Sequence, residues 1–301
     1  MDVGIALGRL MDWDAIKINR PAVHVGMGAC QAWNYSKFLG ACMSQSEHTV
    51  TAVIITKNEE AHLRDCLASV SEWVDEIVIL DSGSTDATRE IAAQYGARFY
   101  QNSEWSGFGK QRQRAQGYVA STWCFWLDAD ERVSSALRDE ILSVVRQGAG
   151  GSVYAIPRLN WFFGRFIRHC GWYPKPVVRL YPTALTHYND ACVHEQVNIL
   201  DSMSMKTMDN DLIHYPYADL RQYVNKSSLY ASQWAKMKAD KGKKSSLSGA
   251  FFRSILRFFR MFVFQKGMLD GKQGFLLCVL SSYYTFLKYA ELWILSQSAK
   301  K

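Results

Sequence analysis

The sequence predicts an α/β fold, in which a mostly parallel, doubly wound sheet is followed by a helical C-terminal region. Short β-branched strands alternate with helices of about ten to fifteen residues between residues 49 and 146, a pattern typical of a parallel sheet with helices on both faces. Hydrophobic residues make up 48% of the 301 residues, which is enough for a sizeable core. With 6 prolines and 20 glycines, the composition excludes a fibrous or disordered chain.

Each of the four strands predicted in this region is a short apolar run. They lie at Val50–Thr56, Glu76–Asp81, Ala97–Gln101 and Trp123–Glu131. Beyond them, residues 152–213 have an irregular pattern with shorter strand-like pieces. Ligands of doubly wound sheets bind at the carboxyl ends of the strands. We therefore expect a site at the strand ends where Thr56, Asp81, Asp128 and Asp130 lie.

The predicted helices begin at residues with a capping side chain. Asn58 is the predicted N-cap after the first strand, and Ser84 or Thr85 is the predicted N-cap after the second. Ser134 is predicted to cap a helix that continues to Arg146. Further helices are predicted at Thr88–Tyr95 and Gly109–Val119.

Three carboxylates lie at the carboxyl end of the fourth predicted strand, in the motif LDADE. Asp128 and Asp130, two residues apart at a strand end, can share a hard divalent cation, and Glu131 comes next. The alternative is a solvated turn, because an Asp-x-Asp pair is common by chance. This motif alone does not decide between the two.

The motif DSGSTDAT follows the second strand. Asp81 at its start can accept hydrogen bonds from a nucleobase or ribose, and Gly83 lets a ligand approach the backbone closely. The alternative is that the turn only caps the next helix through Ser84 or Thr85.

Taken in order, the motifs VIITKNEE, EIVILDSGSTDAT, GKQRQRA and WLDADE resemble family 2 inverting glycosyltransferases of the GT-A fold over residues 49–146. Three later motifs, VHEQV, IHYPY and GMLDGKQGF, resemble the subgroup of lipopolysaccharide core β-glycosyltransferases and extend the similarity to residue 290. Residues 1–48 have weak periodicity and no clear strand or helix pattern, so we expect a poorly ordered N-terminal extension there. The resemblance implies a glycosyltransferase domain at 49–218. In that domain, 49–150 would bind the donor and 151–218 the acceptor.

The resemblance also implies roles for single residues. The nucleotide sugar would be bound by Thr56, Glu59, Asp81, Arg112 and Asp128. A divalent metal, Mn²⁺ or Mg²⁺, would be held by Asp130, with His214 as a further candidate ligand. Many relatives have a second acidic residue where this chain has Ser82, so only one carboxylate is expected in that turn.

An inverting transfer needs a general base that deprotonates the acceptor hydroxyl while the leaving diphosphate is stabilised on the opposite side. Glu195 in VHEQV is the predicted base, with Glu131 or Asp190 as alternatives. His194, beside it, is expected to be a structural hydrogen-bonding residue.

The net charge of +7 is distributed unevenly along the chain. Residues 221–301 hold 15 Lys and Arg against 3 Asp and Glu, which predicts an anionic partner for the region at 219–301. Within it, Arg253, Arg257 and Arg260 share one stripe of a predicted aromatic helix at 249–264, as in helices that lie on membranes. The alternative is packing against the catalytic domain.

The uncharged run at 273–287 has 15 residues, fewer than the roughly 20 that span a bilayer, so we expect the chain to lie on a membrane rather than cross it. No nucleic-acid-binding motif accompanies the charge, and nucleic acid is not an expected partner. Seven scattered cysteines without ligand spacing predict reduced thiols in the cytoplasm.

The resulting hypothesis is a cytoplasmic, membrane-peripheral transferase that moves a sugar, from UDP-glucose, onto the inner core of lipopolysaccharide. A polyprenyl-phosphate or exopolysaccharide acceptor would share every donor motif. The other alternative is a membrane-associated protein that binds nucleotide sugars without catalysis.

Overall fold

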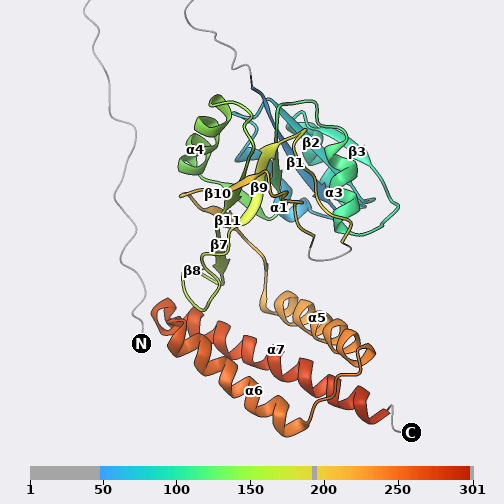
Figure 1. The fold of residues 1–301 in the computed structure, drawn as a ribbon, viewed down its shortest axis with the longest axis vertical. Helices are drawn as coiled ribbons and strands as arrows, with labels where there is room; N and C mark the ends of the chain where they lie inside the picture. Colours follow the sequence, from blue (N-terminus) through green and yellow to red (C-terminus); the bar gives the residue numbers. More distant parts are fainter. Residues whose placement is uncertain (1–47, 192–194, 299–301) are drawn as a thin grey trace, which may run out of the picture. The chain divides into compact units, whose positions relative to one another are not determined.

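The computed structural model describes residues 48–191 and 195–298, all of which belong to one compact unit, Ser46–Lys301. Most of the predicted N-terminal extension, and His194, lie outside the described residues. The described chain forms a seven-stranded sheet with helices packed beside it, a smaller four-stranded sheet and a helical C-terminal region (Figure 1).

The larger sheet has the order β10-β6-β9-β4-β1-β2-β3. The pairs β1–β2, β1–β4, β2–β3 and β6–β10 are parallel, whereas β9 is antiparallel to β4 and to β6. The strands are β1 (Val50–Thr56), β2 (Glu76–Asp81), β3 (Arg98–Gln101), β4 (Trp123–Leu127), β6 (Ser152–Ile156), β9 (Val177–Pro182) and β10 (Ser204–Thr207). The predicted α/β fold is confirmed, with a mixed and mostly parallel sheet.

Four helices connect or follow the N-terminal strands. They are α1 (Glu60–Ala68), α2 (Thr88–Gln94), α3 (Phe108–Gln116) and α4 (Ser135–Arg146). On one side of the sheet, Leu63 and Leu67 of α1 and Leu137 of α4 are fully buried against β1 and β4. The apolar faces of these helices thus form the core on which the strand ends are positioned.

The predicted cap at Ser134 is confirmed, because its side chain accepts a hydrogen bond from the Leu137 amide. The prediction that Asn58 caps α1 is wrong, since Glu59 precedes that helix and makes no side-chain cap. Ser84 and Thr85 do not cap α2 either, because Ala87 holds the N-cap position. These polar side chains instead tie two neighbouring turns together, as described below.

The observed fourth strand, β4, is shorter than the predicted one. β4 ends at Leu127, and after a turn the chain continues as β5 (Glu131–Val133) in the second sheet. That sheet has the order β5-β11-β7-β8 and contains β7 (Arg158–Phe162), β8 (Arg165–Ile167) and β11 (Leu212–His214). Asp128 and Asp130 therefore lie in the turn between two strands of different sheets.

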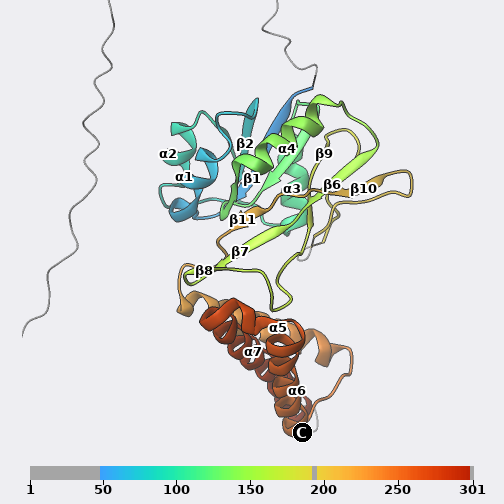
Figure 2. The same cartoon turned by 90° about the vertical axis from the view of Figure 1, so that its left-hand side faces the viewer.

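The C-terminal region contains α5 (Leu220–Asp240), α6 (Leu247–Phe259), a π-helical turn (Arg260–Phe264), a 3-10 turn (Gly267–Asp270) and α7 (Gly271–Ser298). α7 packs along both α5 and α6 (Figure 2). A third apolar cluster joins this region to the second sheet, with Phe162 and Ile167 packed with Leu277. Among the described helices, none combines the length and the apolar character that a membrane span requires.

Candidate active site

The carboxyl ends of β1 and β2 meet at a buried pair of side chains. Thr56 and Asp81 are partners in the parallel register, and Thr56 Oγ1 donates to Asp81 Oδ2 at 2.9 Å. Both residues are almost completely buried. The structure thus brings together two of the residues expected to bind the nucleotide.

The carboxylate of Asp81 holds its own turn. Its Oδ1 accepts hydrogen bonds from the amides of Gly83 (2.8 Å) and Ser84 (2.7 Å), and its Oδ2 accepts from Thr56 and from Ser84 Oγ. A carboxylate has about four acceptor positions, and all four are in use. Gly83 has a φ of +88°, a conformation that favours glycine. Asp81 therefore shapes the turn that would face a nucleoside.

The turns after β1 and β2 are tied to each other. The Asn58 side chain accepts a hydrogen bond from the Thr85 amide at 2.8 Å, and the Asn58 amide donates to Ser84 Oγ at 2.7 Å. Lys57 Nζ donates to the carbonyl of Ser82 at 3.1 Å. These bonds explain why Asn58, Ser84 and Thr85 do not cap helices, because their polar atoms are used between the two turns.

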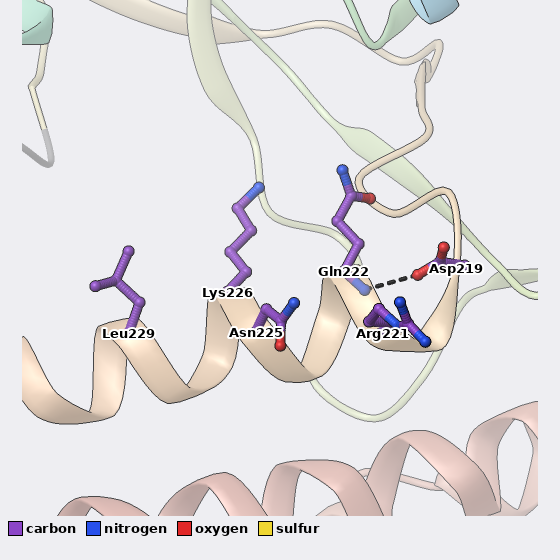
Figure 3. Close-up of a pocket in the computed structure, with 6 residues that line it drawn as sticks. All are labelled: Asp219, Arg221, Gln222, Asn225, Lys226 and Leu229. Carbon is purple, nitrogen blue, oxygen red and sulfur yellow. Dashed lines mark hydrogen bonds between the residues drawn. The ribbon is translucent and has the colours of Figure 1, made fainter.

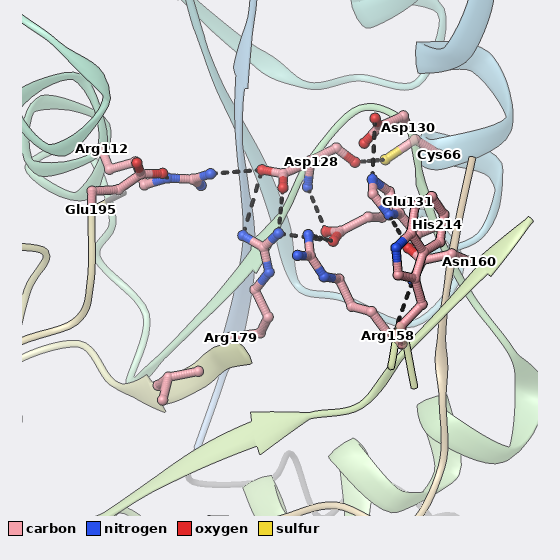
Figure 4. A network of polar contacts seen from close by, with 12 residues as sticks. Cys66, Arg112, Asp128, Asp130, Glu131, Arg158, Asn160, Arg179, Glu195 and His214 are labelled. Atoms are coloured by element: carbon pink, nitrogen blue, oxygen red, sulfur yellow. Dashed lines mark hydrogen bonds and ion pairs between the residues drawn. The ribbon is translucent and has the colours of Figure 1, made fainter. Parts of the chain in front are cut away.

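Asp128, at the end of β4, lies between two buried arginines (Figure 4). Arg112 Nη2 of α3 is 2.7 Å from Asp128 Oδ1, and Arg179 of β9 contacts both carboxylate oxygens. Burial alone would raise the pKa of Asp128, but the charges of Arg179 and Arg112 outweigh it and hold that pKa well below its usual range. Asp128 is thus a permanent anion whose oxygens face arginine.

Glu131 is fully buried behind Asp128. Its Oε1 is 2.8 Å from Arg179 Nη2 and 3.5 Å from Arg158 Nη1, and its Oε2 accepts from the Asp128 amide at 2.9 Å. A general base must reach the acceptor hydroxyl, and a carboxylate with no exposed surface does not. This burial disfavours Glu131, the alternative base.

Asp130 points away from this arginine cluster and toward β11. His214 Nε2 is 3.3 Å from Asp130 Oδ2, and His214 Nδ1 is 2.6 Å from Asn160 Oδ1 of β7. An Nδ1–H donated to Asn160 leaves the Nε2 lone pair directed at the space beside Asp130, as in metal-binding histidines that are oriented by a second residue. Figure 4 shows this pair on the opposite side of Asp128 from Arg112.

The Asp130–His214 pair can supply an oxygen and a nitrogen ligand to a divalent cation. In the described part of the chain, no group of three or more metal-ligating side chains converges on one point. Mg²⁺ and Mn²⁺ sites of phosphate-binding enzymes often use one or two protein ligands and take the rest from the substrate phosphates and water. The pair therefore fits a cation that is completed by a bound diphosphate.

Glu59, between β1 and α1, is a further carboxyl near this pair. Its partial burial, and then the negative charges of Asp130 and Asp128, raise the pKa of Glu59 to about 7. An elevated carboxyl pKa beside other carboxylates is typical of functional sites, since a cation or a hydrogen-bonding ligand would relieve the repulsion. Glu59 thus belongs to the same electrostatic cluster as the predicted metal ligand.

Glu195, the predicted base, is held by the arginine that also holds Asp128. Arg112 Nε is 3.0 Å from Glu195 Oε1, and the Glu195 side chain is 15% exposed. Residues 189–191, earlier in the chain, pack closely on α3, since a Cβ on Gly109 would lie 2.0 Å from the carbonyl oxygen of Asn189. The other alternative base, Asp190, is on the surface and bonded to Gln113 Nε2 at 2.7 Å.

Sequence reasoning missed Arg179 and Asn160. Arg179 is a single charged residue inside the apolar run of β9, a pattern that indicates a buried ion pair. Asn160 gives no comparable signal, because its role depends on the parallel pairing of β7 with β11. Two buried donor atoms, Arg112 Nη1 and Arg179 Nε, have no hydrogen-bond partner among the described residues. An anionic ligand would fit beside such donors.

A shallow groove of about 450 Å³ runs along the first turns of α5 (Figure 3). Asp219 caps this helix by accepting from the Gln222 amide at 2.7 Å, and Gln222 and Lys226 extend from the same side of it. The charge of Lys226 acts on Glu59 and opposes the rise of its pKa. Lys226 thus contributes a cation to the electrostatics of the acidic site.

Comparison with known proteins identifies the domain that carries this site. Residues 51–196 match the family model described as glycosyl transferase family 2. The chain carries a family 2 glycosyltransferase domain. The matched residues include Arg112 and its two ion-pair partners, Asp128 and Glu195, whereas His214 lies beyond them.

Curated relatives match over most of this glycosyltransferase. An uncharacterized glycosyltransferase of Rickettsia felis is 28% identical over 257 residues, which cover 81% of this chain and 89% of the relative. The lipopolysaccharide core biosynthesis glycosyltransferase LpsC of Rhizobium meliloti is 29% identical over 259 residues, which cover 81% and 92%. Among solved structures, TarS 1–349 of S. aureus in complex with UDP aligns with a TM-score of 0.43 at 15% identity, over 84% of this chain and 91% of that one.

Proposed function

We propose that this glycosyltransferase is an inverting enzyme that moves glucose from UDP-glucose onto the inner core of lipopolysaccharide. The observation that carries the proposal is the arrangement around Asp128. Arg112 and Glu195 lie on one side of it, and Asp130 with His214 lies on the other. An inverting transfer needs a base and a site for the leaving group on opposite sides of the sugar.

The donor would bind where β1, β2 and β4 end. The turn held by Asp81 would face the nucleoside, with Thr56 and Glu59 beside it. The Arg112 Nη1 atom, which has no hydrogen-bond partner among the described residues, would face the anionic nucleotide sugar next to Asp128. Asp130 and His214 would hold Mn²⁺ or Mg²⁺, and a bound cation supplies charge stabilisation to the leaving diphosphate.

The chemical step uses the protein's own carboxylate. Glu195 would accept the proton of the acceptor hydroxyl as that oxygen forms its bond to the anomeric carbon, while the bond from this carbon to the diphosphate oxygen breaks and UDP leaves with the electron pair. The ion pair with Arg112 would keep Glu195 in place during this step. Each turnover releases UDP and a glucoside of inverted configuration.

The acceptor is proposed from the relatives. LpsC, which is named as a lipopolysaccharide core biosynthesis glycosyltransferase, matches 81% of this chain and not only the donor half. An acceptor of this class is lipid-linked, and exposed Phe252, Leu256 and Phe259 on α6 would bring the enzyme to the surface of a membrane. We place the enzyme on the cytoplasmic face, where its buried thiols Cys66 and Cys124 would stay reduced.

A transfer assay with purified enzyme tests the proposal. Labelled UDP-glucose and Mn²⁺ are incubated with truncated lipopolysaccharide inner core, with polyprenyl phosphate or with an exopolysaccharide intermediate. We expect label in the inner-core product with inverted configuration at the anomeric carbon, and none with Asp130→Ala. Transfer to another acceptor alone would overturn the acceptor, and neither transfer nor slow donor hydrolysis with any cation would favour a non-catalytic binding protein.

A further inference from the structure

The surface of α6 is divided into three sectors. Ala250 and Ser254 are buried against α7, where Ser282 Oγ donates to the Ser254 carbonyl at 2.6 Å. Phe252 and Leu256, 63% and 67% exposed, lie on the opposite side. Arg253, Arg257 and Arg260 form a stripe between these two sectors. They directly follow the exposed residues Phe252, Leu256 and Phe259, and one position corresponds to about 100° around a helix.

Two phenylalanines near the end of this helical segment do not belong to the exposed apolar sector. The ring centres of Phe258 and Phe262 lie 5.4 Å apart, and both rings contact Phe275 of α7. The exposed apolar sector therefore includes neither ring. The arginine stripe lies between this exposed sector and α7.

A groove of about 410 Å³ lies where this stripe faces α7. Its cationic lining consists of Arg253, Arg257, Arg260 and Lys288, and Tyr284 and Tyr289 contribute rings. Arg253 lies 4.7 Å from the Tyr289 ring centre and Lys288 Nζ lies 4.9 Å from that of Tyr284, so the rings hold two of the four cations in position.

No acidic side chain among the described residues neutralises the charges in this groove. Within the described residues, none of the four cations forms an ion pair with a carboxylate, and no acidic side chain lines the groove. The acid nearest in sequence, Glu291, accepts a hydrogen bond from Ser232 Oγ of α5 at 2.7 Å. Burial, and then the charges of Arg257 and Lys238, lower the pKa of Lys288, as expected for a cation that lacks a counterion.

We infer that the groove between α6 and α7 is a binding site for the phosphate headgroup of one anionic membrane lipid, whose acyl chains lie along the exposed apolar sector of α6. Four cations around one groove complement a phosphate, and guanidinium groups bind it through paired, charge-assisted hydrogen bonds. Leu256 belongs to both the groove and the apolar sector, so the headgroup and chain positions are continuous.

This site is separate from the proposed catalytic chemistry and more specific than attraction to a charged surface. A diffuse basic patch responds only to the charge density of a membrane. A built groove discriminates between headgroups of different shape. A phosphomonoester offers more oxygens and more charge to the four cations than a phosphodiester does, so the site is expected to prefer phosphatidic acid.

Vesicle binding by the full-length protein tests this inference. Phosphatidylcholine vesicles contain either phosphatidic acid or phosphatidylglycerol, adjusted to equal surface charge, and binding is measured by co-sedimentation. The test variant is Arg257→Gln/Lys288→Gln, and the matched control is Lys243→Gln/Lys244→Gln, which removes the same charge from the exposed linker between α5 and α6. Thermal unfolding checks that both variants remain folded.

We expect wild-type protein to bind phosphatidic acid vesicles at least about tenfold more tightly than the matched vesicles, a difference of about 1.4 kcal/mol. The groove variant should lose this preference, and the control should keep it while binding both vesicles more weakly. Equal binding to both lipids by wild-type protein, or a preference retained by the groove variant, would overturn the inference. Tight binding of inorganic phosphate to the same groove, measured by calorimetry, would also contradict the inference that a lipid is its ligand.

Discussion

Arg112 bridges two carboxylates that are far apart in the sequence, with Nη2 2.7 Å from Asp128 and Nε 3.0 Å from Glu195. Its guanidinium carbon also lies 5.1 Å from the ring centre of Trp126 and 5.0 Å from that of Tyr188. One buried cation from α3 thus fixes the end of β4 relative to the proposed base. The planar guanidinium is suited to this task, because it donates in several fixed directions at once.

Arg112→Met should destabilise the protein by about 3–5 kcal/mol, since it leaves Glu195 without its ion-pair partner and Asp128 with Arg179 alone. Urea unfolding measures this loss. Arg138→Met, which removes a surface pair with Asp139, is the control and should cost less than about 1 kcal/mol. Equal effects of the two substitutions would contradict a structural role for the buried bridge.

Glu195→Gln should lower kcat by about 10² to 10⁴ and leave the Kd of the donor unchanged. The amide oxygen can still accept a hydrogen bond from Arg112, but it cannot take the proton of the acceptor. Steady-state kinetics and donor calorimetry separate the two effects. Asp190→Asn, on the nearby surface, serves as the control, and loss of turnover in that variant with normal turnover in Glu195→Gln would exchange their roles.

Glu59→Gln should make the protein more stable at neutral and alkaline pH. Folding raises the pKa of this carboxyl from 4.5 to about 7, so the folded state becomes less favourable as the pH rises through this window and the unfolded state releases the proton first. Glutamine carries no charge to bury. The increase in the free energy of unfolding should be absent below about pH 4.5. Above pH 7 it should be on the order of 1 kcal/mol, after allowance for the partial exposure of Glu59. Denaturant unfolding as a function of pH measures it, and a gain that is equal at all pH values would refute the assigned cause.

Asn160→Ala should weaken metal binding by about 10- to 100-fold, because His214 would lose the hydrogen bond at Nδ1 that directs its Nε2 toward Asp130. Calorimetric titration of Mn²⁺ in the presence of UDP measures this change. The control is Asn198→Ala, which removes an amide 3.5 Å from Nδ1 of another histidine, His187. Unchanged Mn²⁺ affinity in Asn160→Ala would remove His214 from the proposed metal site.

The strand and helix pattern of the donor half is predictable from the sequence because buried β-branched runs and amphipathic helices follow local periodicity. The ends of the elements are less predictable. Asn58 resembles an N-cap, but its side chain accepts from the Thr85 amide in a neighbouring turn, and no local signal distinguishes the two uses. Likewise, β4 ends at Leu127 because the chain crosses to the second sheet.

The candidate site was predictable one residue at a time, through its motifs, but not as a network. Asp128 and Asp130 are equivalent in the motif, yet Asp128 binds two arginines and Asp130 faces His214. Arg179 comes from a strand 51 residues away from Asp128, and only the antiparallel pairing of β9 with β4 brings it there. Long-range pairing of this kind leaves no periodic trace in a single sequence.

Calorimetric titration of UDP-glucose into the full-length protein, first with Mn²⁺ and then with excess chelator, tests whether a metal ion assists donor binding. We expect saturable binding with Mn²⁺ that is lost on chelation and in Asp130→Ala, and a preference for UDP-glucose over other nucleotide sugars. Binding that is indifferent to chelator and to the loss of Asp130 would contradict the proposed metal-assisted donor site.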